Sequence, residues 1–156
     1  LPSFDNESDE VKLSIHSEDG ELIKEFSDKS KENSIKVKKG GNSFVWDMKY
    51  PGAKRLDNMV LWGADFSGAK TVPGDYIVKL SVNDSELTQD FTIHKDPTSE
   101  GSIEDIKAQF EFVNEINDVV NEAHNAIENI RKIKKDLTKF QSDYAANESA
   151  KNLINE

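Results

Sequence analysis

The C-terminal part of the chain contains neither glycine nor proline from Ser102 to Glu156. Both residues interrupt helices, so their absence over this stretch favours one long helix. Ser102 is a good N-cap, and Glu104 and Asp105 suit the positive end of a helix dipole. Apolar residues recur about every 3.5 residues, as in a coiled-coil seam, at Ile103, Ile106, Phe110, Val113, Ile116, Val120, Ala123, Ile127, Ile130, Ile133, Leu137, Phe140 and Tyr144. The pattern predicts a long amphipathic helix with one apolar stripe.

The length of this helix predicts that part of its stripe needs a partner. A helix from Ser102 to about Lys139 would be about 57 Å long, whereas strands of six to nine residues span only about 20–30 Å. Thr138, Asn147 or Ser149 can cap a second helix, which predicts a helical hairpin with a short return arm over 145–156. The remaining stripe is expected to contact an upstream domain of the same polypeptide or a second copy of the chain, through Val120, Ile127, Ile130 and Leu137.

The N-terminal part follows a period of two, which is typical of strands with one buried face. The alternation predicts seven strands, at 11–16, 21–26, 34–38, 43–50, 58–63, 75–83 and 86–94. Asp19-Gly20, Gly40-Gly41 and Pro73-Gly74 supply turn residues between them. Short strands at this spacing favour a seven-stranded, Ig-like antiparallel β-sandwich over 11–96, with Trp46, Tyr76, Leu80 and Phe91 in its core. Residues 1–10 are expected to form an acidic tail, 97–101 a linker, and 102–156 the helical tail.

Charge and composition exclude several functions. Acidic residues outnumber basic ones 30 to 20, for a net charge of −10, which disfavours binding to nucleic acid. The chain has no cysteine, so disulfides, thiolate metal sites and cysteine nucleophiles are excluded. No apolar run reaches the ~20 residues of a transmembrane helix. The chain begins at Leu1 without a signal-peptide pattern, and we interpret it as a fragment or a processed product.

Few residues form a pattern that indicates chemistry. We interpret Trp46 as a core residue and Asp47 as an exposed carboxylate that accepts backbone hydrogen bonds from the following corner. A glycosidase would require a carboxylate pair such as Asp47 and Asp65, but nothing in the spacing selects these two. His16, His94 and His124 lie far apart without the spacing of metal ligands. The sequence predicts no catalytic residue, no metal and no cofactor, and it leaves Trp62 and Phe66 as aromatic residues for ligand contact.

Several segments together resemble a known arrangement: SEDGELIKEF, GGNSFVWDMKYPGAKR, MVLWGADFSG, VPGDYIVKLSVND and FTIHKDP, followed by IEDIKAQFEFVNEINDVVNEAHNAIENIR. They resemble the C-terminal region of large bacterial exported proteins that begin with a sortilin-type BNR-repeat β-propeller and are often loosely labelled glycosyl hydrolases. The resemblance covers roughly residues 10–135. It implies a periplasmic or extracellular location, and it transfers no catalytic residue, because activity would be expected in the propeller.

Three functions follow from these observations as hypotheses. The first is a non-catalytic accessory or assembly module that packs against or orients a preceding propeller. The second is a carbohydrate- or peptide-binding module that uses exposed aromatic residues near Trp62 and Phe66. The third is a hydrolase fragment, which would require a cleft with converging carboxylates.

Overall fold

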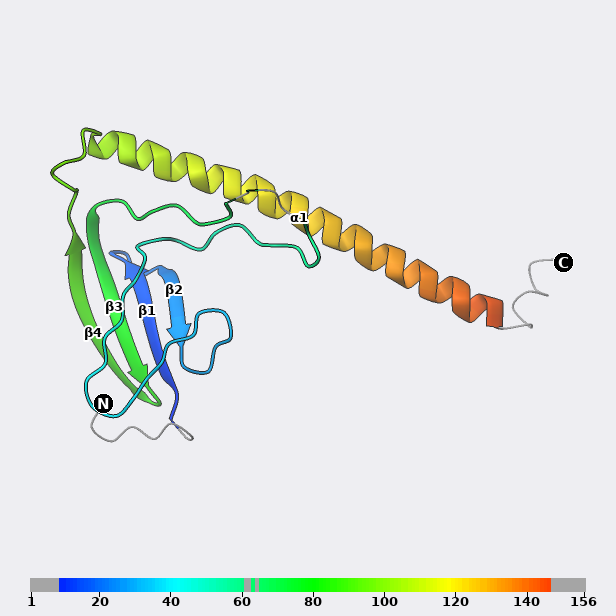
Figure 1. Ribbon diagram of the computed structural model, residues 1–156, viewed down its shortest axis with the longest axis horizontal. Coiled ribbons are helices and arrows are strands. Elements are labelled where there is room, and N and C mark those ends of the chain that lie inside the picture. Colours follow the sequence, from blue (N-terminus) through cyan, green and yellow to red (C-terminus); the bar gives the residue numbers. More distant parts are fainter. Residues whose placement is uncertain (1–8, 61–62, 64, 147–156) are drawn as a thin grey trace. The chain divides into compact units, whose positions relative to one another are not determined.

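A computed structural model describes residues 9–60, 63 and 65–146 (Figure 1). It contains four strands and one helix, which are β1 (Val11–Ser17), β2 (Leu22–Ser27), β3 (Gly74–Val82), β4 (Ser85–Ile93) and α1 (Ile103–Ala146). The strands predicted at 11–16, 21–26, 75–83 and 86–94 are therefore confirmed to within one residue at each end.

The four strands form a single antiparallel sheet in the order β2-β1-β3-β4. The register pairs Leu13 with Leu80 and Ile15 with Val78. Because side chains alternate between the two faces of a sheet, this register collects the apolar residues of β1 and β3 on one face. The Asp19-Gly20 turn joins β1 to β2, and Gly20 takes the positive φ of 86° that this tight reversal requires.

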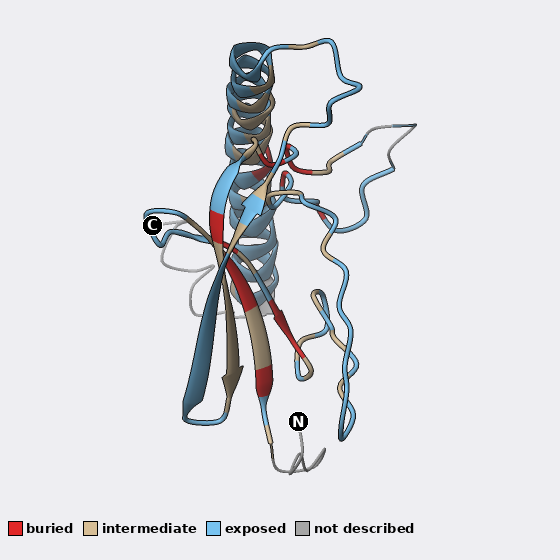
Figure 2. Ribbon diagram, turned by 90° about the vertical axis from the view of Figure 1, so that its left-hand side faces the viewer, coloured by how far each residue is buried: buried red, intermediate tan, exposed pale blue. Residues whose placement is uncertain are grey.

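The core of the sheet consists of Ile15, Ile23, Phe26 and Tyr76. Figure 2 shows buried segments on β1 and β2, where Val11, Ile15 and Phe26 lie. Leu13, Ile35, Trp46, Tyr50, Val78, Phe91 and Ile93 are partly buried and pack against this core. Of the four predicted core residues, Tyr76 is buried in this core, Trp46 and Phe91 are half-buried and pack against it, and Leu80 is half-buried outside the cluster.

An irregular layer stands where the seven-stranded sandwich was expected, so that prediction is wrong. Segments 34–38 and 43–50 contain no strand, and neither do the described residues of 58–63. Positive φ angles at Gly40, Met48 and Asn58 interrupt the extended conformation that a ladder needs. In the described residues, pairing here is limited to two isolated bridges: Ser34 pairs with Ser27, and Lys49 pairs with Lys70, where Tyr50 N donates to Ala69 O at 2.9 Å. Irregular extended chain also alternates its side chains, so the period of two did not distinguish it from a strand.

The Trp46-Asp47 pair divides between core and surface as the sequence predicts. The Trp46 ring lies 6.3 Å from Tyr76 and 6.5 Å from Phe91, in edge-on contacts. Asp47 is exposed and accepts a hydrogen bond from Lys49 N at 3.2 Å. Its carboxylate also lies 3.5 Å from Lys24 Nζ. The pair therefore lies in an extended segment that turns, and its two side chains have separate roles: Trp46 packs against the core, and Asp47 is exposed.

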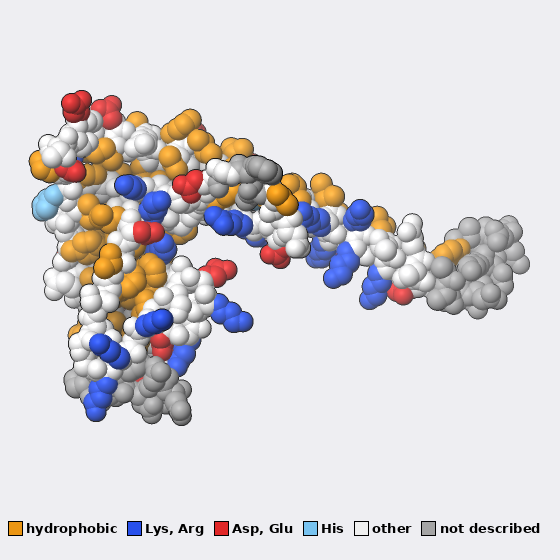
Figure 3. All heavy atoms as spheres, viewed as in Figure 1, with side chains coloured by type: hydrophobic (Ala, Val, Ile, Leu, Met, Phe, Trp, Pro, Cys, Tyr) orange, Lys and Arg blue, Asp and Glu red, His pale blue; other side chains and the backbone are white. Residues whose placement is uncertain are grey.

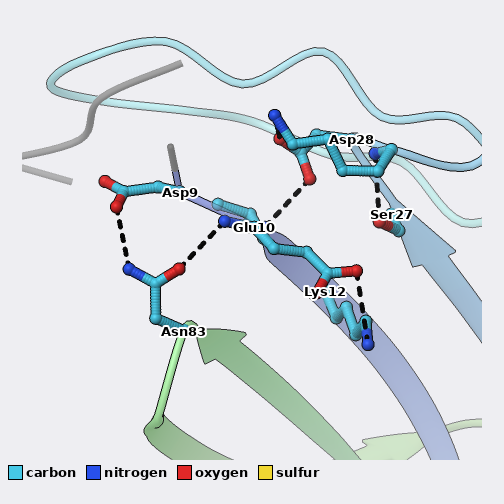
Figure 4. Close-up of polar contacts among 8 residues, drawn as sticks. Asp9, Glu10, Lys12, Ser27, Asp28 and Asn83 are labelled. Atoms are coloured by element: carbon cyan, nitrogen blue, oxygen red, sulfur yellow. Dashed lines mark hydrogen bonds and ion pairs between the residues drawn. The ribbon is translucent and has the colours of Figure 1, made fainter. Parts of the chain in front are cut away.

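Two polar side chains hold the start of β1 (Figure 4). Asn83, at the β3–β4 turn, accepts from Glu10 N at 3.0 Å and donates to Asp9 Oδ1 at 2.8 Å. Asp28, just after β2, accepts from Val11 N at 2.9 Å. Asn83 has a φ of 52°, a conformation that asparagine tolerates better than most residues. These bonds satisfy backbone groups where β1 begins.

The helix α1 begins at the predicted N-cap. Ser102 Oγ accepts from Asp105 N at 3.0 Å, and Ser102 N donates to Asp105 Oδ2 at 2.9 Å. These two bonds form a capping box with aspartate in the third position. The hydrogen bonds from the backbone and side chain of Ser102 hold the pKa of Asp105 below its ordinary value.

The predicted helical hairpin is wrong, because α1 continues to Ala146 through the region where a turn was expected. The Thr138 hydroxyl donates to Lys134 O at 2.9 Å, so it is satisfied inside the helix and caps no second one. Most of the predicted return arm over 145–156 lies outside the described residues. The absence of glycine and proline allowed the helix to continue past Lys139.

The chain divides into two compact units, and the division falls within α1. Unit 1 comprises Leu1–Gly52 and Ser67–Glu115, and unit 2 comprises Ala53–Phe66 and Ile116–Glu156. In unit 1, the first turns of α1 pack on the irregular layer through Phe110, whose ring lies 4.8 Å from that of Tyr50. The expected linker at 97–101 lies within unit 1.

Candidate interaction surface

One face of α1 in unit 2 is covered by the chain's own loop. Lys54 makes three contacts there: its N donates to Asn121 Oδ1 at 2.7 Å, its carbonyl accepts from His124 Nδ1 at 2.5 Å, and its Nζ forms an ion pair with Glu128 at 2.5 Å. Ala53, Leu56 and His124 are buried in this contact. The 53–66 loop is therefore attached to the helix by its backbone as well as by apolar packing.

His124 has a packing role in this arrangement. A carbonyl oxygen can only accept, so the contact with Lys54 O requires that Nδ1 of His124 carries a proton. The imidazole ring also lies 5.8 Å from the ring of Phe66. Further along the helix, Arg131 Nη1 donates to Asp57 O at 3.0 Å. No group of three or more potential metal ligands occurs among the residues that the structure describes.

The structure describes five of the six predicted contact residues, and these five differ in exposure and surroundings. Phe66 is half-buried, with His124 beside its ring and the Arg55 guanidinium 5.7 Å from its centre. Trp62 lies outside the described residues. Val120 is half-buried, whereas Ile130 and Leu137 are well exposed. Asp47 and Asp65 belong to different units, so they define no carboxylate pair within either unit.

A second face of α1 carries a continuous apolar surface. Its members are separated by alternating steps of three and four residues, and we call them the exposed row: Ile116, Val119, Ala123, Ala126, Ile130, Ile133, Leu137 and Phe140. The larger side chains of the row have exposed fractions of 47% for Ile116, 65% for Val119, 65% for Ile130, 58% for Ile133, 59% for Leu137 and 68% for Phe140. At about 100° per residue, the row lies about 150° around the helix from the residues that hold the loop.

The sequence predicted a single apolar stripe along α1, whereas in the structure the apolar residues of α1 lie on two faces. The predicted stripe contains consecutive steps of three residues, from Phe110 to Val113 to Ile116 and again from Ile127 to Ile130 to Ile133. Each step of three falls about 60° short of a full turn, so two in succession move the stripe around the helix. Phe110 and Val120 pack within the chain, whereas the exposed row follows a strict alternation. This alternation of three- and four-residue steps was the sequence signal for the exposed row, but the broader predicted stripe obscured it.

Charged side chains occur along the same stretch of α1 as the exposed row (Figure 3). Basic residues occur close together at Arg131, Lys132, Lys134, Lys135 and Lys139. Acidic residues occupy Asp118, Glu122, Glu128, Asp136 and Asp143. Unlike the chain as a whole, residues 116–144 therefore have balanced charge. In the part of the chain that the structure describes, no helix is apolar and long enough to cross a bilayer.

Unit 1 contains an apolar cavity that the sequence did not indicate. Its volume is about 540 Å³, within the range of small-molecule sites. The apolar side chains that line it are Val11, Leu13, Ile35, Val37, Phe44 and Leu80. Asn42, at its rim, accepts from Lys38 N at 2.9 Å and donates to Lys38 O at 2.8 Å, so its amide holds the 38–42 loop. The cavity arises because an irregular layer fills the sheet face less completely than a second sheet would.

Burial raises the pKa of two tyrosines in unit 1, Tyr50 and Tyr76. The pKa of Tyr76 is raised, first because its hydroxyl is desolvated and second because Tyr50 is nearby. That hydroxyl donates to Val72 O at 2.6 Å. A neutral, hydrogen-bonded phenol is what a core position requires, and the shift therefore indicates a structural role.

Comparison of the chain with known protein families, with curated proteins and with solved structures finds no match.

Proposed function

We propose that this chain is a non-catalytic accessory and assembly module, and that the exposed row of α1 is the surface through which it binds another polypeptide segment. The row is the observation that carries the proposal. Between Asn121 and Arg131, described residues of the 53–66 loop cover the opposite side of the same helix, whereas the large residues of the row stay exposed.

The exposed apolar area supports this function. Scaled by ordinary side-chain areas, the six large residues of the row expose about 650 Å² of apolar surface, at the upper end of the largest patches on monomers, which are about 300–600 Å². Burial of such surface is favourable by about 25 cal/mol per Å². Glu122, Lys134 and Asp136 adjoin members of the row and resemble the polar rim that surrounds the apolar core of protein interfaces. The resemblance noted in the sequence adds that the setting is an exported protein with a preceding propeller.

A photo-crosslinking experiment tests this function. A benzophenone amino acid is placed at Ile133, in the row, or at Lys132, on another side of the helix, in cells that produce the protein from its own gene. We expect Ile133 to cross-link to one defined polypeptide, identified by mass spectrometry, and Lys132 to give far less product. If both positions give no product, or equal amounts of it, the row is not a binding surface.

The cavity in unit 1 favours a second function, the binding of an apolar ligand or peptide side chain. Six apolar side chains line it together with a few polar residues such as Ser34 and Asn42, as in many ligand sites. Leu80→Trp should fill it, because the larger ring enters from the sheet side. We expect an apolar fluorescent dye to bind the wild-type chain with a saturable signal and to lose this signal in Leu80→Trp. Equal dye binding by both proteins would contradict this function.

A further inference from the structure

The spacing of the exposed row has the form of a coiled-coil heptad. Alternating steps of three and four place Ile116, Ala123, Ile130, Leu137 and Tyr144 at the first apolar position of each heptad, and Val119, Ala126, Ile133 and Phe140 at the second. An ideal straight helix drifts by about 20° per heptad relative to such a repeat. A row that keeps the strict repeat from Ile116 to Tyr144 therefore fits a helix that supercoils with a partner of the same geometry.

We propose that this partner is a second copy of the chain, and that two α1 helices pair in parallel and in register along the exposed row. This inference rests on the proposed function, because it names the partner that the row binds. Within the described residues of unit 2, every large member of the row from Ile116 to Phe140 is exposed, while the loop covers the other side of the helix between Asn121 and Arg131.

The area is sufficient for a stable pair. Two copies would remove about 1300 Å² of apolar side chain from water, which falls within the 1,200–2,000 Å² of specific interfaces before any flanking residue is counted. Ala123 and Ala126 have small side chains that let the two helices approach closely at the middle of the seam. Phe140 and Tyr144, whose rings lie 6.4 Å apart and are stacked, provide bulk at its end.

The flanking charges favour the parallel orientation. In a parallel coiled coil, the residue just before a first apolar position lies near a residue five positions further along the partner helix. That partner residue is the one just after a second apolar position. This places Glu122 near Ile127, Asn129 near Lys134 and Asp136 near Gln141. None of these pairs brings like charges together.

The antiparallel alternative brings acidic residues together. With the seams fully overlapped, residues that precede the first apolar position face each other. Glu122 would then lie near Asp143 of the other copy, and this repulsion would occur twice in a symmetric dimer. Like-charge pairs at such positions are destabilising.

An anionic membrane surface is the competing occupant. The basic residues from Arg131 to Lys139 would favour it, because amphipathic helices that lie on membranes carry Lys and Arg beside their apolar face. Over residues 116–144, however, basic and acidic residues balance, and Asp118 and Glu122 occur along the first half of the row. The balanced charge and the strict heptad favour a second copy.

Disulfide trapping tests the pairing directly, because the chain has no cysteine of its own. Ala123→Cys and Leu137→Cys place one thiol each at a first apolar position, where a parallel pair brings identical residues together. Lys132→Cys is the control on another side of the helix. We expect the first two variants to form covalent dimers under mild oxidation and Lys132→Cys to form far less. In the antiparallel arrangement neither Ala123→Cys nor Leu137→Cys would meet itself, and that result would overturn the proposal.

Sedimentation equilibrium and vesicle flotation complete the test. The wild-type chain should be a dimer, and Ile130→Asp with Ile133→Asp should raise its dissociation constant at least about a thousandfold. Lys132→Asp with Lys135→Asp introduces as many acidic residues away from the row and should leave the dimer intact. A monomeric wild type, or binding to phosphatidylserine vesicles that Ile130→Asp with Ile133→Asp abolishes, would overturn the inference. A cross-link from Ile133 to a different polypeptide would also overturn it while supporting the proposed function.

Discussion

Replacement of Trp46 separates two contributions of one side chain to the stability of unit 1. The Trp46 ring packs edge-on against Tyr76 and Phe91, the aromatic part of the sheet core. Its indole Nε1 is buried, and no hydrogen-bond acceptor reaches it in the described part of the chain. The ring should therefore stabilise the unit, while the buried N–H should destabilise it.

Trp46→Ala removes both contributions. Large aromatic residues in full burial cost about 3–5 kcal/mol when truncated to alanine. Because Trp46 is only half-buried, we expect a loss of about 2–3 kcal/mol in the free energy of unfolding. For a unit of roughly 100 residues, the melting temperature should then fall by about 8–15 °C.

Trp46→Phe is the matched variant, because it keeps an aromatic ring and removes the buried N–H. A buried donor without a partner costs about 1–3 kcal/mol, which offsets the smaller ring. We expect Trp46→Phe to melt within about 3 °C of the wild type or above it. Differential scanning calorimetry measures both variants. The reasoning is refuted if Trp46→Ala melts within about 2 °C of the wild type, or if Trp46→Phe is as unstable as Trp46→Ala.

Three further predictions concern polar contacts. Asn83→Ala should lower the free energy of unfolding by about 1–2 kcal/mol, because it removes the side-chain hydrogen bonds to the start of β1 and leaves alanine at a positive φ. Chemical denaturation measures this loss, and an unchanged free energy of unfolding would contradict it. The depressed pKa of Asp105 means that its stabilisation is present above its ordinary value of about 3.9 and is lost as the pH falls through the lower pKa of the folded state. Ser102→Ala keeps the backbone donor and removes the hydroxyl donor, so it should raise that pKa part of the way toward its ordinary value, as followed by NMR titration; an unshifted pKa would show that the Ser102 hydroxyl does not contribute to it. His124→Ala should speed hydrogen exchange in the 53–66 loop, because the Lys54 carbonyl loses its hydrogen-bond donor. Asn125→Ala, at an exposed position, is the control and should leave the exchange rate unchanged. Equal exchange rates in the two variants would show that His124 does not hold the loop.

The sequence alone determined the features that depend on local physical chemistry. Four strands, the Asp19-Gly20 turn and the N-cap at Ser102 follow from side-chain alternation, backbone freedom and hydrogen-bonding groups close in sequence. The outward position of Asp47 beside the inward Trp46 follows from the same alternation.

Tertiary structure decided how the remaining segments meet. Whether 34–38 and 43–50 pair as strands depends on partners distant in the chain, and the positive φ at Met48 reflects packing that no local pattern encodes. Tertiary contacts also decided which face of α1 is covered. The apolar spacing shows that a helix has an apolar side, but it does not show which residues the chain's own loop will cover. Lys54 reaches Asn121 and Glu128 across more than sixty residues of sequence, and this contact separates the covered face of the helix from the exposed row.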